Sequence, residues 1–160
     1  MNYRIIEERD NSILAQIIRD NLKAHKLDIP GTVYYDDAVN HLSDFYLANP
    51  DKRTYYVALD DSDAVIGGIG MDELDFMDET AELQKLYLTD SAKGSGLSYE
   101  LIDLIEQAAR DMGYKHMYLE THHNLAAAIH VYESCGYRLI DRPDAVVHSS
   151  MDRFYMKDLY

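Results

Sequence analysis

Disulfide-forming cysteines, long apolar runs and clusters of basic residues are all missing from this sequence. Cys135 is the single cysteine, so no disulfide can form within the chain, and this favours a reducing compartment. No apolar run approaches the roughly 18 residues that cross a bilayer. The first residues also lack the apolar core of a signal peptide. These absences predict a cytoplasmic protein with no membrane partner.

Positive charge is scarce as well. Lysine and arginine together number 15 against 29 aspartate and glutamate residues, which gives a formal net charge of -14. Nucleic-acid binding needs basic clusters that neutralise phosphates, so we expect no nucleic-acid partner. The negative charge is compatible with a cationic substrate or with a solubilising surface alone, because a total charge does not locate a site.

The length and the even composition indicate one domain covering residues 1–160. Apolar residues make up 47% of the chain, enough for a substantial core. We find no internal repeat, low-complexity tract or linker.

Hydrophobic periodicity predicts an alternation of strands and helices. The expected strands cover residues 3–8, 54–59, 64–71, 81–89, 115–121, 137–140 and 152–159. The expected helices run from Asp10 or Asn11 to about 23, over 37–48, over 97–112, and from a cap at Asn124 to Gly136. This order predicts a mixed sheet with helices on its faces, an α/β fold in the broad sense.

A glycine-rich loop joins the strand at 81–89 to the helix that starts near Leu97. It reads Lys93-Gly94-Ser95-Gly96-Leu97-Ser98. Glycines allow a tight turn, and the free N–H groups of the helix start favour binding of an anion, most often a phosphate. The loop fits neither a Walker A motif nor a Rossmann fingerprint. A purely structural helix start is the alternative reading.

A second motif lies on the last predicted helix. Ala128, Ile129 and Tyr132 fall three and four residues apart and share one face. The Tyr132 phenol could donate a proton to a thiolate or alkoxide leaving group. A tyrosine packed in the core is the alternative.

Together the two motifs resemble those of the GNAT superfamily of acetyl-CoA-dependent N-acetyltransferases. That family carries Arg/Gln-x-x-Gly-x-Gly/Ala at the start of one helix and Asn…Ala-x-x-x-Tyr-Glu-x-x-Gly-Phe/Tyr on a later one. The later motif stands here as Ala128-Ile-His-Val-Tyr132-Glu133-Ser-Cys-Gly136-Tyr137. The resemblance implies an α/β (α+β) fold with a central mixed, mostly antiparallel sheet flanked by helices on both faces.

The resemblance also implies acetyl-CoA as co-substrate. Backbone amides of Lys93, Gly94, Ser95, Gly96, Leu97 and Ser98 would hold its pyrophosphate. Leu86, Tyr87 and Leu88 would pair with pantetheine like an added strand, beside a bulge that opens the sheet. Asn124 would contact pantetheine, and Tyr132 would protonate the departing thiolate. The chain departs from the family pattern in having Lys93 for arginine or glutamine, Ser98 for glycine or alanine, and Asn124 eight residues before Tyr132.

The attacking amine must lose a proton, and three routes are open. Glu82 is our main candidate for the base, Glu120 is a rival, and an ordered-water chain needs no dedicated side chain. The expected activity is transfer of an acetyl group to a primary amine of a small molecule or peptide. A non-catalytic acyl-CoA-binding or regulatory module on the same fold is the alternative.

The remaining expectations concern the acceptor, metals and assembly. Tyr34, Tyr35 and Phe76 are expected to form an aromatic wall of the acceptor site. The adjacent His122 and His123 do not complete a set of three or four metal ligands, so no metal is expected. Members of the family that this sequence resembles are often dimers, so a homodimer is a possible assembly.

Overall fold

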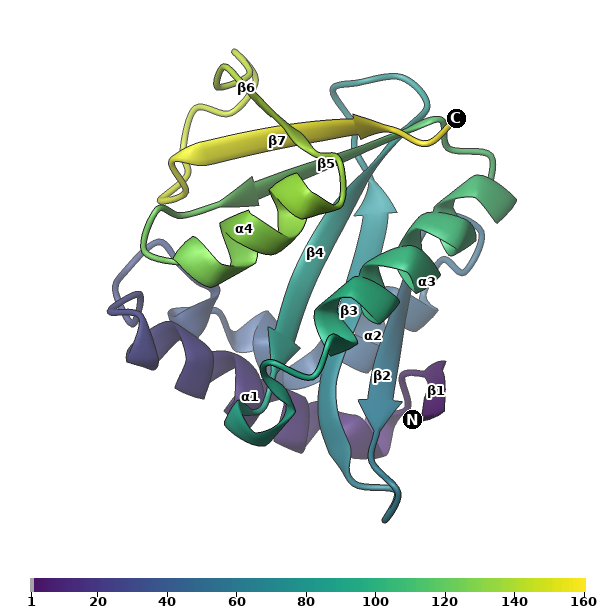
Figure 1. The fold of residues 1–160 in the computed structure, drawn as a ribbon, viewed down its shortest axis with the longest axis vertical. Coiled ribbons are helices and arrows are strands. Elements are labelled where there is room, and N and C mark those ends of the chain that lie inside the picture. The colour runs from purple at the N-terminus through teal and green to yellow at the C-terminus, as the bar shows by residue number, and fades with distance from the viewer. Residues whose placement is uncertain (1) are drawn as a thin grey trace.

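One seven-stranded sheet forms the centre of the molecule. The computed structural model describes residues 2–160, and the strand order in the sheet is β1-β2-β3-β4-β5-β7-β6 (Figure 1). The strands are β1 (Asn2–Ile5), β2 (Thr54–Leu59), β3 (Val65–Glu73), β4 (Thr80–Leu88), β5 (His116–Thr121), β6 (Arg138–Ile140) and β7 (Arg153–Asp158). Among the strands of residues 2–160, only β4 and β5 pair in parallel. The predicted mixed, mostly antiparallel sheet is therefore confirmed.

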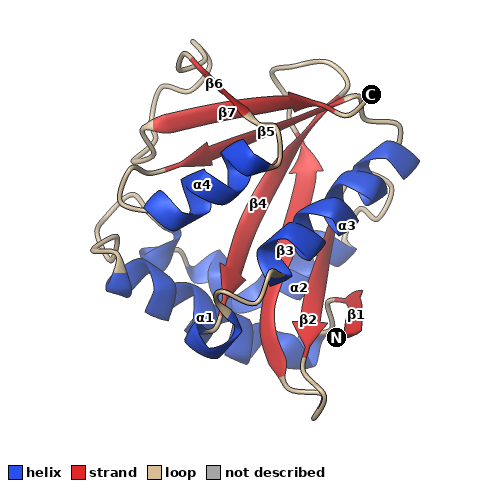
Figure 2. Cartoon of the chain, in the orientation of Figure 1, coloured by secondary structure: helices blue, strands red, loops and turns tan. Residues whose placement is uncertain are grey.

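Four α-helices cover the two faces of the sheet (Figure 2). They are α1 (Asn11–Ala24), α2 (Leu42–Leu47), α3 (Leu97–Asp111) and α4 (Ala126–Ser134). Helices α1 and α2 pack on one face in a core that includes Leu14, Ile18 and Tyr46. Helices α3 and α4 pack on the other face, where the core includes Ile105 and Tyr132. No helix of residues 2–160 has the length and apolar character to cross a membrane.

The two long helices form where the apolar periodicity predicts them. In α1 the buried stripe contains Leu14, Ile17, Ile18 and Leu22, three or four residues apart. Helix α3 ends just before Gly113, whose φ of 94° suits the left-handed turn that follows many helices. The sequence therefore specifies these helices locally.

Several predicted boundaries were wrong. The first strand ends at Ile5, because residues 8–10 form a 3-10 turn that leads into α1. The predicted helix over 37–48 is split into a 3-10 segment, Asp37–His41, and the short α2. Strand β3 extends to Glu73, two residues beyond the predicted strand over 64–71. None of these differences changes the topology.

The sheet opens between β4 and β5. These strands pair only at Thr80–His116, Ala81–Met117 and Glu82–Tyr118, and beyond that point they part (Figure 1). The split lies at the centre of the fold, between the two helical layers.

A β-bulge in β4 follows the last paired position. Gly70 pairs with Gln84 and Gly68 with Tyr87, so two residues of β4 oppose one residue of β3. One of the two is Lys85, which has a φ of 51°. Such a left-handed conformation is costly for a residue with a side chain and needs support from its surroundings.

Glycines in β3 leave room for aromatic side chains behind the bulge. A Cβ atom at Gly68 would lie 2.4 Å from the Tyr55 ring, and one at Gly70 would lie 2.6 Å from it. Tyr55 is fully buried, and its hydroxyl donates to the carbonyl oxygen of Lys85 at 2.9 Å. The glycines thus let Tyr55 reach and hold the bulge.

Candidate functional site

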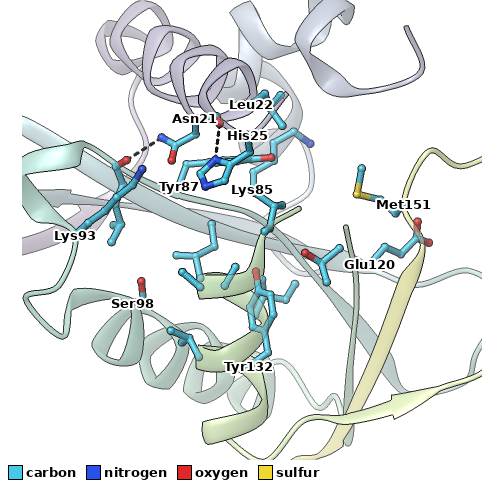
Figure 3. A pocket seen from close by; sticks show the side chains of 18 of the residues that line it. Asn21, Leu22, His25, Lys85, Tyr87, Lys93, Ser98, Glu120, Tyr132 and Met151 are labelled. Carbon is cyan, nitrogen blue, oxygen red and sulfur yellow. Dashed lines mark hydrogen bonds between the residues drawn. The ribbon is translucent and has the colours of Figure 1, made fainter. Parts of the chain in front are cut away.

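A cavity of about 280 Å³ lies where β4 and β5 part. Its wall combines the end of α1, the second half of β4, the glycine loop, the end of β5 and one face of α4 (Figure 3). The lining residues with polar side chains are Asn21, His25, Lys85, Tyr87, Lys93, Ser98, Glu120, Thr121 and Tyr132. Two elements far apart in sequence, the glycine loop and α4, thus meet around one space.

The backbone edge of β4 faces this cavity at Leu88. The N–H of Thr89 donates to Ile66 in β3 at 2.9 Å. Adjacent residues of a strand direct their polar groups to opposite edges, so the N–H and C=O of Leu88 face the gap. The Asn21 side-chain amide donates to the Leu88 carbonyl oxygen at 2.8 Å from the other side of the gap. The Leu88 carbonyl oxygen therefore has a hydrogen-bond partner within residues 2–160, whereas the Leu88 N–H remains available to a ligand.

The glycine loop presents backbone N–H groups to the solvent side of the cavity. Gly94 and Gly96 have φ values of 77° and 82°, and a Cβ at either would meet nothing within 4 Å. They are thus needed for backbone conformation and not for space. No hydrogen bond of residues 2–160 uses the N–H groups of Gly94, Ser95 or Gly96. With the first turn of α3 these groups form an anion-binding arrangement.

Tyr132 projects its phenol from α4 into the cavity (Figure 3). Its ring is buried and lies edge-on to Tyr137, with centroids 6.0 Å apart. Burial, together with the nearby Tyr87 and Cys135, raises the pKa of the Tyr132 phenol above its ordinary value. The phenol therefore stays protonated through the neutral range and can act as a hydrogen-bond or proton donor.

The two candidate bases lie on the two strands that part. Glu82 accepts a hydrogen bond from Gln84 at 2.8 Å, and Gln84 in turn accepts one from Tyr46 at 2.6 Å. Burial raises the pKa of the Glu82 carboxyl, an effect that the Gln84 bond opposes and nearby Glu120 reinforces. Such a carboxyl is better matched to take a proton near neutral pH than an ordinary one.

Glu120, and not Glu82, lines the cavity itself. Its carboxylate accepts hydrogen bonds from Tyr118 at 2.9 Å and from Ser149 at 3.1 Å. Glu82 lies outside the lining but close enough for the two charges to interact. The structure thus brings the main candidate and its rival together.

The structure brings six of the ten predicted cofactor residues to the cavity. They are Leu86, Tyr87, Leu88, Lys93, Gly94 and Ser98. Ser95 and Gly96 lie in the same loop outside the lining, while Leu97, the first residue of α3, is buried in the core.

The helix cap predicted at Asn124 was wrong. Leu125 occupies the cap position of α4, and no side chain caps the helix there. The exposed Asn124 instead donates to the carbonyl oxygen of His25, at the end of α1, at 3.0 Å. It lies outside the cavity lining, because its side chain is used to join two helices.

The predicted aromatic wall is not assembled. Tyr34 and Tyr35 contact each other with ring centroids 5.0 Å apart, and Tyr35 is 65% exposed. Phe76 instead packs against Tyr118, in a separate cluster with Phe154. None of the three predicted residues lines the cavity.

The adjacent histidines have a partner that the sequence did not reveal. Candidate ligand atoms of His122, His123 and Asp152 all lie within 4.8 Å of one another. The His123 N–H donates to Asp152 at 2.9 Å, and the His123 ring is hydrogen-bonded to the same carboxylate. The Asn124 N–H donates to Nδ1 of His122 at 3.1 Å, which places the proton of a neutral ring on Nε2, the atom a metal would need. Through these contacts the cluster joins the loop before α4 to Asp152, the residue just before β7.

Asn21 and Lys85 are two of the cavity residues that the sequence reasoning missed, along with His25 and Thr121. Asn21 follows Ile17 by four residues and so interrupts the apolar stripe of α1. Lys85 falls between Leu83 and Leu86, whose spacing of three breaks the alternation of a regular strand. Both departures were readable signals of a functional or irregular position.

Comparisons with known proteins agree with this geometry. A family profile described as the acetyltransferase (GNAT) family matches residues 14–137. The uncharacterized N-acetyltransferase YjgM of Escherichia coli K12 is 31% identical over 134 residues, which cover 83% of this chain and 79% of that protein.

Solved structures show the same fold at lower identity. A GNAT-family acetyltransferase from Staphylococcus aureus Mu50 superposes with a TM-score of 0.84 at 19% identity, over 99% of both chains. YncA of Salmonella typhimurium, a putative acetyltransferase solved with acetyl-CoA, gives a TM-score of 0.76 at 19% identity, over 100% of this chain and 94% of that one. By its sequence match and its fold, the chain belongs to the GNAT family of acetyltransferases.

Proposed function

We propose that this protein transfers the acetyl group of acetyl-CoA directly to a primary amine. The observation that carries the proposal is the shared cavity. One space is lined by the polar edge of β4 at Leu88, by the glycine loop and by the Tyr132 phenol. An extended thioester needs these three contacts: a strand edge for its amides, N–H groups for its phosphates and a donor for its sulfur.

Each group would act on a different part of the transfer. Acetyl-CoA supplies the activated acyl group. The amine attacks the carbonyl carbon, the new C–N bond forms and the C–S bond breaks. The Leu88 N–H would polarise the carbonyl oxygen. Tyr132, kept protonated by its raised pKa, would donate a hydrogen bond and then its proton to the departing sulfur, and the proton that the nitrogen loses on becoming an amide would restore the phenol.

The ammonium form of the acceptor must lose a proton before it can attack. Glu120 lines the cavity and Glu82 lies close enough for their charges to interact, and one or both would take this proton, directly or through water. We favour Glu82 as the final acceptor because burial raises the pKa of its carboxyl.

The proposal is tested in two stages. Thermal-shift measurements with acetyl-CoA, CoA, ATP and NAD should show stabilisation by the first two alone. Release of free CoA thiol is then followed over a broad panel of amines, with mass spectrometry of the products. Stabilisation by CoA with no thiol release over the panel would instead support an acyl-CoA-binding module without catalysis.

A further inference from the structure

Lys85 differs from every other lysine in the part of the chain that the structure describes. Four lysines, at positions 52, 93, 115 and 157, form ion pairs with carboxylates. Two more, Lys23 and Lys26, are exposed to solvent. Lys85 is partly buried in the cavity wall, and no carboxylate of residues 2–160 lies within the 4.0 Å of an ion pair.

An ammonium group in this position is poorly compensated. Burial lowers the pKa of Lys85, and the more distant Glu82, Asp36 and Asp72 only partly offset this effect. Removing a charge even partly from water without a hydrogen-bonded partner costs free energy, so lysines that are largely buried are usually paired. A bound anion would supply the missing partner.

The bulge fixes the point on the backbone from which the Lys85 side chain extends. Lys85 holds a left-handed backbone conformation, and its carbonyl is tied to Tyr55 at 2.9 Å. The side chain therefore starts from a rigid point at the split of the sheet. Because the backbone is already fixed, only the ordering of the side chain costs entropy when a ligand binds.

Glu120 provides the opposite charge in the same cavity. It is the one carboxylate among the described residues that line the cavity, and Tyr118 and Ser149 hold it in place. In Figure 3, Lys93 and Glu120 lie at opposite ends of the cavity in the view. Lys93 belongs to the glycine loop and is paired with Asp90 at 2.9 Å. Of the two lysines that line the cavity, Lys85 is thus the one without a paired carboxylate, and it is available to bind the acceptor.

We propose that Lys85 binds a carboxylate of the acceptor while Glu120 receives its ammonium group, so that the acceptor is an amino acid or a similar amino-carboxylate. This inference rests on the proposed acetyl transfer and specifies its substrate class. Simple amines and polyamines have no group for Lys85, and their binding would leave its ammonium unpaired.

The test compares matched acceptors that differ only at the carboxylate. Each amino acid is assayed beside its primary amide and its decarboxylated amine, and kcat/KM is measured from thiol release. We expect the free acids to be preferred by about 10- to 100-fold, the range of one charge-assisted hydrogen bond. Amino acids with different separations between amine and carboxylate would show which geometry fits.

Three variants connect that preference to Lys85. In Lys85→Met the ratio of acid to amide should approach one, whereas Lys85→Arg should keep a preference for the acid because the charge remains. Lys23→Met is the matched control, since Lys23 is exposed on α1. Circular dichroism and the melting temperature report whether each variant is folded. An unchanged acid preference in a folded Lys85→Met would overturn the assignment.

The failure of this inference can be told apart from failure of the proposed function. If the wild-type protein acetylates amides and simple amines as well as acids, transfer stands and the role of Lys85 does not. If no amine is acetylated, calorimetry on the protein with bound CoA gives a second readout. Equal binding of acid and amide in that experiment would overturn the inference as well.

Discussion

The Tyr55 hydroxyl is hydrogen-bonded to the Lys85 carbonyl oxygen at 2.9 Å, directly behind the point where the sheet opens. Tyr55 is wholly buried, and the glycines of β3 give its ring the room to reach β4. The shape of the site thus depends on a side chain that does not line the cavity. This relationship leads to the first of four predictions.

Tyr55→Phe should lower both stability and activity. The loss of one buried hydrogen bond should cost about 1 kcal/mol in the free energy of unfolding. We also expect a loss of kcat/KM larger than the factor that corresponds to this free energy, because the bulge positions Lys85 and the strand edge that follows it. The matched control is Tyr114→Phe, since Tyr114 makes a similar buried bond to the Lys52 carbonyl, at 2.8 Å, away from the cavity. Equal kinetic effects in the two variants would show that the Tyr55 bond has no special role.

Tyr132→Phe should reduce turnover while CoA binding changes little. The phenol is placed to assist departure of the sulfur, so the loss should appear in kcat by about 100-fold or more, in the range of acid catalysis. The neighbouring Tyr137 is bonded to Glu106 in the core, so Tyr137→Phe should lower stability with little change in kcat. Steady-state kinetics and CoA titration check both variants, and full activity in Tyr132→Phe would remove Tyr132 from the mechanism.

Gly94→Ala and Gly96→Ala should weaken CoA binding. Both residues have positive φ, so a side chain adds backbone strain of about 1–2 kcal/mol and shifts the free N–H groups of the loop. Gly113→Ala carries similar strain, with a φ of 94°, at the far end of α3. Calorimetry should show weaker CoA binding only for the two loop variants, and denaturation should show reduced stability for all three. A Gly113→Ala effect on CoA binding as large as theirs would contradict the proposed phosphate role.

The pH profile of kcat/KM should fall on its acidic side at a higher pH than an ordinary carboxyl would give. Burial raises the pKa of the Glu82 carboxyl, so the carboxylate needed to accept a proton is lost as pH falls through that raised value. We expect kcat/KM to decline below it and Glu82→Gln to remove this limb while lowering the plateau. Profiles of Glu82→Gln and Glu120→Gln measured side by side identify the group. Loss of the limb in the Glu120 variant alone would assign it to Glu120.

The fold followed from local signals that the tertiary structure did not override. The apolar stripe of α1, the glycine at the end of α3 and the run of β-branched and aromatic residues in β2 each specify an element without help from distant residues. The boundaries failed where 3-10 turns replaced regular structure, as before α1 and before α2. Hydrophobic spacing does not distinguish these turns from the adjoining elements.

The site was harder to predict because its parts are joined only in three dimensions. The glycine loop and Tyr132 were identified from short motifs, and both lie at the cavity. Phe76 was misplaced because proximity to Tyr118 depends on how β5 crosses the fold. Lys85 was overlooked, although the spacing between Leu83 and Leu86 marks an extra residue in the strand. An irregular spacing in an otherwise alternating strand merits the same attention as a motif.

The parting of β4 and β5 also bears on how the protein avoids aggregation. An unpaired strand edge at the rim of a sheet invites strands from other chains. Here the unpaired polar groups near Leu88 lie inside the molecule, between α1 and α4, and Asn21 already occupies one of them. A whole β-sheet from another copy cannot enter a space of about 280 Å³. The fold can therefore keep a binding edge permanently open to a narrow, extended ligand without exposing a template for self-association.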